Sequence, residues 1–128
     1  MATVGKITGV SDNYRNYVYT ITGINATGTT PSFRSQGFVI GSWQVTGITA
    51  NGLTTQLAGS NDGSNFYALQ TGVIAADGVY GMIAGTQAAA VSDYNFSNIV
   101  PLYFLFNIGG TEGSGSATIT VALISTFG

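Results

Sequence analysis

The sequence predicts an all-β protein, an antiparallel β-sandwich of the jelly-roll or immunoglobulin-like kind with about seven or eight strands. Apolar and polar residues alternate over short segments, which is the period of a strand with one buried face. Asn-Gly, Asp-Gly and Gly-Gly pairs separate these segments, and they readily take the positive φ angles of tight hairpins. Only residues 87–91 could form a helical turn or two, which is too short to be stable alone.

The alternation is clearest near the end of the chain, where residues 117–123 place Ala, Ile, Val and Leu on one face and Thr on the other. Residues 1–16 have weak patterning and are predicted to be an extended N-terminal arm. A single sandwich domain is expected over residues 17–128. Its predicted strands are residues 17–24, 36–48, 53–59, 65–70, 79–84, 99–108 and 117–125.

One predicted strand does not alternate. Residues 99–108 read IVPLYFLFNI, and a continuous apolar run implies burial on both faces. Two explanations remain open: a central strand whose outer face is covered by another part of the chain, or a strand that faces another subunit.

Charged residues are scarce, with three cations and five acids in 128 residues, or 6% against roughly 25% in an ordinary domain. Few charges favour association with neighbours, although Thr, Ser and Asn could instead keep the chain soluble. No basic patch, long apolar run or leader-like start is visible. We therefore expect no nucleic-acid partner, no membrane span and no secretory signal.

The chain contains no His and no Cys. Nucleophilic catalysis therefore lacks its usual base, and soft metals lack their preferred ligands. Most of the five acids stand in turn-like stretches, where an acid normally forms the turn. We expect no enzymatic activity, no cofactor and no metal centre.

The stretch LAGSNDGSNFYAL, residues 57–69, places a polar core between two strand-like segments. Its sequence favours a hairpin turn at Asn61, Asp62 and Gly63, because Gly63 can take the left-handed conformation. A calcium site at Asn61, Asp62 and Asn65 is the alternative, although the stretch offers a single carboxylate.

The same stretch resembles a pattern of small β-sandwich structural proteins of tailed bacteriophages, in which a strand ends in GSNDG and an aromatic residue opens the next strand. A second matching element is Val100-Pro101-Leu102-Tyr103, followed by a Gly-rich turn and a terminal Thr/Val strand. The agreement covers about residues 36–125. An Arg that often follows the second element is absent, so its contact cannot be carried over.

The resemblance implies a capsid decoration, or cement, protein. It would be made in the host cytoplasm, lie on the virion surface, bind the major capsid protein and assemble as a homotrimer. A neck or tail component is a related possibility. A glycan- or receptor-binding module is another, and it would use exposed aromatic residues such as Tyr67, Tyr80 or Tyr94.

If the resemblance holds, three surfaces are expected to make contacts. Tyr14 and Arg15 would anchor the arm on a neighbour, because Tyr and Arg are enriched at the energetic centres of interfaces. Arg34 could pair with an acid on a partner. The apolar strand would face another copy through Tyr103, Phe104 and Phe106.

Overall fold

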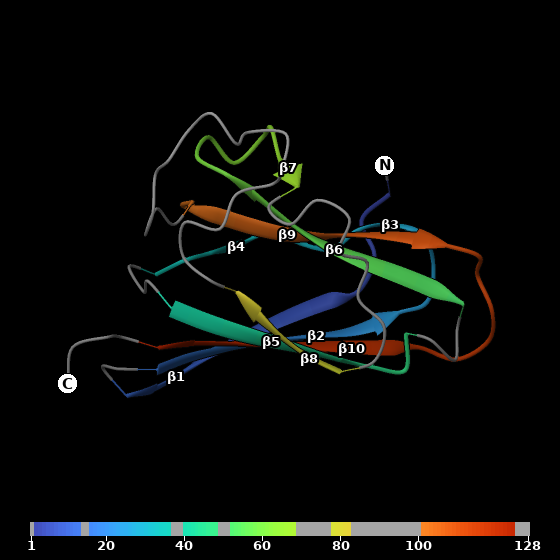
Figure 1. The fold of residues 1–128 in the computed structure, drawn as a ribbon, viewed down its shortest axis with the longest axis horizontal. Coiled ribbons are helices and arrows are strands. Elements are labelled where there is room, and N and C mark those ends of the chain that lie inside the picture. Colours follow the sequence, from blue (N-terminus) through green and yellow to red (C-terminus); the bar gives the residue numbers. More distant parts are fainter. Residues whose placement is uncertain are drawn as a thin grey trace.

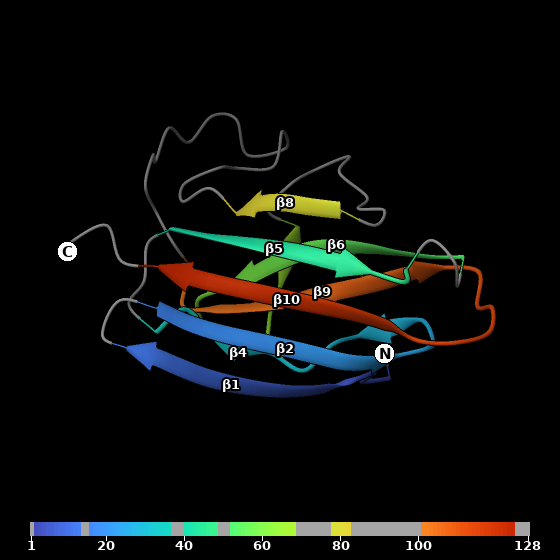
Figure 2. The same cartoon turned by 90° about the horizontal axis from the view of Figure 1, so that it is seen from below.

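The structure is a computed structural model that describes residues 2–13, 16–36, 40–48, 52–68, 78–82 and 101–124. Within these ranges the chain forms ten strands and no helix, arranged as two antiparallel sheets that face each other (Figures 1 and 2). The prediction of an all-β antiparallel sandwich is confirmed. In the described part of the chain, no helix is long and apolar enough to cross a membrane.

The first sheet has five strands in the order β1-β2-β10-β5-β8. In that order they are Lys6–Asn13, Asn16–Ile24, Ala117–Ile124, Ile40–Thr46 and Gly78–Met82. The second sheet has the order β3-β9-β6-β7, and β4 also pairs with β9. These strands are β3 Gly28–Thr29, β9 Tyr103–Gly110, β6 Leu53–Ser60, β7 Tyr67–Ala68 and β4 Phe33–Arg34.

The order of the strands defines the type of sandwich. Consecutive strands mostly change sheets, and among the described strands only β1–β2 and β6–β7 are neighbours in sequence that pair directly. The last strand, β10, inserts between β2 and β5, while β9 inserts between β3 or β4 and β6. This nesting of late strands between early ones is the double Greek key of a jelly roll. The jelly-roll alternative is therefore the one that the structure adopts.

The predicted strands correspond in position to β2, β5, β6, β7, β8, β9 and β10, with shifted ends. Three strands were missed: β1 and the two-residue strands β3 and β4. The helical turn considered at residues 87–91 lies outside the described residues.

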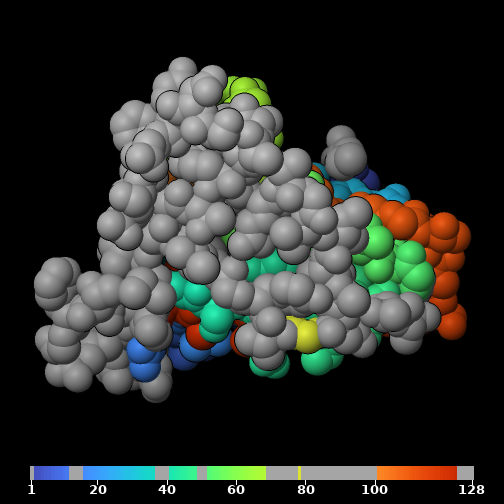
Figure 3. Space-filling view, in the orientation of Figure 1, coloured from blue at the N-terminus to red at the C-terminus, as the bar shows by residue number. Residues whose placement is uncertain are grey.

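Figure 3 shows the ends of β6 and β9, green and orange, together at one end of the molecule, where Leu53 pairs with Gly110.

The N-terminal segment joins the edges of both sheets. The Val4 amide donates a hydrogen bond to the Thr29 carbonyl at 2.8 Å, and the Thr29 amide donates to the Ala2 carbonyl at 2.9 Å. Thr3 thereby forms a parallel bridge with Thr29 in β3. A few residues later the chain enters β1, which pairs with β2 in the other sheet. The segment is extended, as expected, but residues 2–13 form part of the sandwich instead of an arm outside it.

The core lies between the sheets and is rich in aromatic residues. Trp43 of β5 and Phe106 of β9 meet across the sandwich, with ring centroids 4.9 Å apart. Phe33 of β4 stacks on Phe104 and Phe106 at 5.7 and 6.0 Å. Tyr19 of β2 contacts Phe33 at 4.8 Å and so joins the first sheet to this cluster.

The apolar strand β9 is buried on its inner face and, at Leu105, on its outer face as well, whereas Tyr103 and Asn107 on the outer face are only partly buried. Phe104 and Phe106 point into the core and are 1% and 0% exposed, while Leu105 on the other face is 8% exposed. The proposal that Phe104 and Phe106 face another copy is therefore wrong, because both side chains are enclosed between the sheets of their own chain. A continuous apolar run indicates burial but not what provides it.

A substitution at Gly28 in β3 would test the contact between the N-terminal segment and this strand. Its φ is 149°, and a Cβ added there would overlap the carbonyl oxygen of Ala2. We expect Gly28→Ala to lower the free energy of unfolding by about 1–3 kcal/mol, as overpacking does. Gly23→Ala is the matched control, because Gly23 also has positive φ (72°) but has nothing within 4 Å of the added Cβ. Equal losses in urea denaturation of the two variants would contradict a tight contact at Ala2.

Candidate functional site

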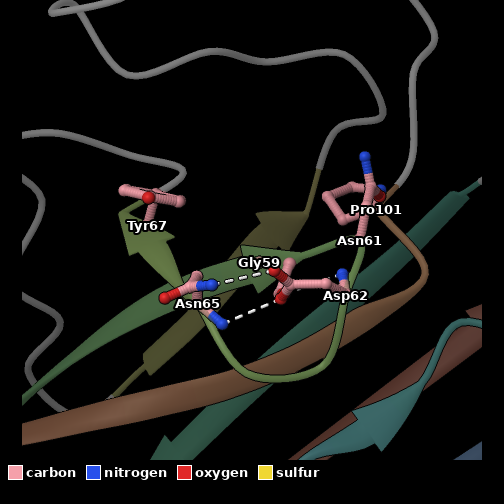
Figure 4. Close-up of a pocket in the computed structure, with 7 residues that line it drawn as sticks. Gly59, Asn61, Asp62, Asn65, Tyr67 and Pro101 are labelled. Carbon is pink, nitrogen blue, oxygen red and sulfur yellow. Dashed lines mark hydrogen bonds between the residues drawn. The ribbon is translucent and has the colours of Figure 1, made fainter.

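The connection between β6 and β7 contains the turn that the sequence singled out (Figure 4). The Asp62 carboxylate organises it. Its Oδ1 accepts hydrogen bonds from the Ser60 hydroxyl and from the Ser64 and Asn65 amides, each at 2.8 Å. Its Oδ2 accepts one from the Asn65 side-chain amide, also at 2.8 Å. Gly63 has φ 77°, the left-handed conformation expected of it.

These donors stabilise the ionised form of Asp62. The backbone amide of Asn65, followed by its side-chain amide and the Ser64 amide, holds the pKa of this carboxyl well below its ordinary value of 3.8. Hydrogen bonds to a carboxylate lower its pKa because they favour the charged state. The negative charge of Asp62 therefore serves to fix the turn.

The turn does not suit the calcium ion considered from sequence. Both Asp62 oxygens already accept hydrogen bonds, and the Asn61 side-chain oxygen accepts one from the Leu102 amide at 3.2 Å. A bound cation would have to displace these N–H groups, because calcium needs several oxygen ligands with available lone pairs. Among the residues described, no three His, Cys, Asp or Glu side chains cluster as a metal site would require.

A shallow pocket of about 410 Å³ opens beside this turn (Figure 4). Tyr67, 73% exposed, forms one wall, and Asn61 and Pro101 form the opposite wall. The pocket has an aromatic wall, but most acceptor oxygens of its turn already serve the fold. The other aromatic candidates cannot be added, because the Tyr80 side chain and Tyr94 lie outside the described parts of the chain.

The structure brings Arg34 and Tyr103 together next to the same turn. The two residues are register partners in β4 and β9, and the Arg34 guanidinium carbon lies 5.2 Å from the centre of the Tyr103 ring. A Cβ added to Gly63 would lie 3.5 Å from this ring. Arg34 and Tyr103 thus form a surface cation–π pair apart from the buried Phe104 and Phe106.

The two residues expected to anchor the N-terminal arm, Tyr14 and Arg15, lie outside the described residues. They follow directly on the end of β1 at Asn13. Their expected contact with a neighbour stays a prediction.

The hydroxyl of Tyr19 fixes the chain after β4. It donates a hydrogen bond to the Arg34 carbonyl at 2.9 Å and accepts one from the Gln36 side-chain amide at 3.0 Å. Burial raises the pKa of Tyr19 above its ordinary value of 10.0, so the hydroxyl keeps its proton. Gln36 has φ 58°, an uncommon conformation for a residue other than glycine.

The surface that sequence reasoning missed is the outer edge of β1. In the described ranges no strand pairs with this edge, and Figure 2 shows β1 as the last strand of its sheet. Lys6, Thr8 and Val10 share the outer face of β1, and Val10 is 63% exposed.

The weak patterning of β1 has a physical cause. Gly9 occupies an inward position opposite Tyr19, and a Cβ there would lie 2.8 Å from Cε1 of Tyr17. Aromatic rings from β2 thus fill the space that an apolar side chain of β1 would occupy. The alternation of apolar and polar residues is lost, so period-two reasoning does not find the strand.

The comparisons with known proteins supply no virion relative. No family model and no curated protein matches this chain. Among solved structures, a cupin domain from Bordetella pertussis Tohama I matches at 16% sequence identity and a TM-score of 0.43. The match covers 98% of this chain and 99% of that one. At this level of similarity it carries no information on activity or ligand.

The predicted resemblance to phage sandwich proteins is therefore corrected, because the match found is to a cupin domain and not to a virion protein. The function that followed from it, a capsid decoration protein or a neck or tail component, is corrected with it. The capsid partner, the trimer and the virion location were expected from the same resemblance, and no comparison tests them.

The Asp62 turn generates a pH-dependent prediction. Because the folded pKa is depressed, Asp62 contributes stability that is present above its unfolded value of about 3.8 and is lost as the pH falls toward the folded pKa. We expect Asp62→Asn to lower the melting temperature at pH 7 and to reduce its fall between pH 4 and pH 2. Ser64→Ala is the control, because the turn uses the Ser64 amide and not its side chain. Parallel melting curves for wild type and Asp62→Asn across this pH range would contradict the assignment.

Proposed function

We propose that this protein is a non-enzymatic self-association module that binds a second copy of itself through the outer edge of β1. The observation that carries the proposal is residues 6–10 of this edge, which are extended and have no partner on their outer side among the described strands. An exposed edge presents unpaired N–H and C=O groups, which are a template for another strand.

The edges of the second sheet differ from this one. They consist of β3, β4 and β7, each of two residues, and very short edge strands are a common protection against unwanted pairing. Among the described edge strands, β1 is the longest, and it pairs on its inner side with the nine-residue β2. In the described part of the first sheet, the opposite edge strand β8 has five residues.

The chemistry of β1 also favours association. Between Lys6 and Asp12 the strand carries no charge, and Val10 at its centre is largely exposed. Charged side chains on an edge normally prevent pairing, and here they stand only near the strand's ends. The scarcity of charge in the whole chain lowers the electrostatic cost of bringing two copies together.

The non-enzymatic part of the proposal rests on composition. With no His and no Cys, the chain lacks the side chains that most often act as general bases and as thiolate nucleophiles. The Asp62 carboxylate, the acid with the strongest hydrogen-bond environment among those described, is committed to its turn.

Pairing through one strand buries less surface than a permanent dimer requires. Interfaces below about 1,200 Å² are typical of transient complexes. We therefore expect an equilibrium between monomer and oligomer in place of an obligate assembly.

The test is the molar mass in solution, measured by light scattering over a concentration series. Wild type is expected to rise above its monomer mass of 13.1 kDa as the concentration increases. Val10→Lys is expected to weaken this association several-fold, because it adds a cation at the edge of each copy.

Gln44→Lys is the matched control, since Gln44 is also exposed on an outer strand face but lies on β5, three strands from β1. A wild-type mass that stays at 13.1 kDa at every concentration would refute self-association. Equal weakening by both lysine variants would refute the assignment to β1.

A further inference from the structure

We infer that the outer face of the first sheet is an ice-binding surface, whose ligand is the ordered oxygen lattice of an ice crystal. The face is formed by β1, β2, β10 and β5, and Figure 2 looks onto it. The inference goes beyond the proposed self-association, because pairing at the β1 edge would extend the sheet and leave this face open.

Threonine dominates the described side chains of this face. Along each strand, residues that alternate with the core residues point outward. Ile21, Val45 and Ile119 are core residues, no more than 1% exposed, and the residues beside them are exposed or half-buried. Six of the outward residues are threonines: Thr8, Thr20, Thr22, Thr46, Thr118 and Thr120.

The threonines form a two-dimensional array. Thr20 of β2 is the register partner of Thr8 on one side and of Thr120 on the other, so three adjacent strands contribute to one row. Thr118 pairs with Thr46 of β5 and begins a second row. Neighbouring strands lie about 4.8 Å apart, and outward residues two positions apart on one strand are separated by roughly 6.5–7 Å. The array therefore has two fixed repeats.

The hydroxyl groups of the array are available to water. Within the described part of the chain, none of the six hydroxyls makes a hydrogen bond. A threonine side chain branches at Cβ, which restricts its χ1 angle, so the backbone fixes where each hydroxyl and methyl group lies. Each hydroxyl can donate one hydrogen bond and accept others. Water bound along such a row is held at the repeat of the sheet.

Charge is nearly absent from the face. Among its described side chains Lys6 alone is charged, and it stands at a corner of the array beside Thr22. The remaining positions are neutral, among them Val18, Ser42 and Ala122. An ammonium group holds a strong hydration shell of its own, which would compete with a crystal lattice for the same water. A neutral face avoids this competition.

The shape and the repeats of the face select the ligand. Small molecules bind in concave sites that enclose most of their surface, and a sheet face is open. A single hydroxyl contact is weak, so affinity requires many contacts made together, which a ligand with the same repeat can make. Ice is a rigid array of oxygen atoms that donate and accept hydrogen bonds, and its repeats are close to the two spacings of a β-sheet.

The twist of the sheet limits the matched area. Adjacent strands are rotated by about 20–25° relative to one another, so the match extends over a few strands only. The register between β2 and β10 also shifts between Ala117 and Ile119, next to Thr118. We therefore expect adsorption to ice and slower recrystallisation, with only a small depression of the freezing point.

The first experiment freezes a dilute solution of the whole chain slowly from one end and measures the protein in the ice and in the remaining liquid. Wild type is expected to enter the ice, whereas an unrelated soluble protein in the same solution is excluded from it. Equal exclusion of the two proteins would overturn the inference. A monomeric protein that enters the ice would support it and refute self-association alone.

The second experiment compares variants. Thr120→Tyr places a bulky ring at the centre of the array and is expected to abolish both entry into ice and the slowing of recrystallisation. Thr54→Tyr is the matched control, because Thr54 is also a half-buried, outward threonine but lies on β6 of the other sheet. Melting curves show whether each variant is folded. Thr22→Tyr, at an exposed position of the array, replaces Thr120→Tyr if that variant unfolds.

The comparison assigns the activity to a face. Loss in the array variant with retention in Thr54→Tyr would support the first sheet as the ice-binding surface. Full activity of a folded array variant, or equal loss in Thr54→Tyr, would overturn that assignment.

Discussion

The contact between Trp43 and Phe106 is the interaction on which the rest of the structure depends. The two rings come from different sheets and lie 4.9 Å apart, and through Phe33 the cluster extends to Tyr19 of β2. An aromatic pair of this kind adds to the large apolar area that each ring buries. Because this contact requires β9 in the core, Phe104 and Phe106 are unavailable to partners.

Strands in which buried and exposed residues alternate could be predicted from the sequence. β10 and the first half of β6 alternate strictly, and their inward residues lie in the core as expected. β1 could not be found, because Gly9 stands where an apolar residue would be expected and rings of β2 fill the space. β3 and β4 have two residues each, which is too short for any periodicity.

The Asp62 turn was predictable because its chemistry is local: Asn-Asp-Gly specifies the turn whatever surrounds it. Its contacts with Leu102 and Tyr103 were not, since they join positions distant in sequence. Phe104 and Phe106 were misassigned because apolarity reports burial without telling whether the cover comes from the same chain. Whether a strand lies at the edge of a sheet depends on the order of all the strands, so it cannot be predicted from one segment of the sequence.

The position of β10 has a consequence for how the chain folds. β10 pairs with β2 on one side and β5 on the other, so the first sheet has no centre until residues 117–124 arrive. Pairing of such distant segments is slow, because much chain must be ordered before the contacts form. A growing chain therefore keeps one edge of β2 and one of β5 open until β10 is made. That intermediate, more than the finished sandwich, is the species most exposed to aggregation.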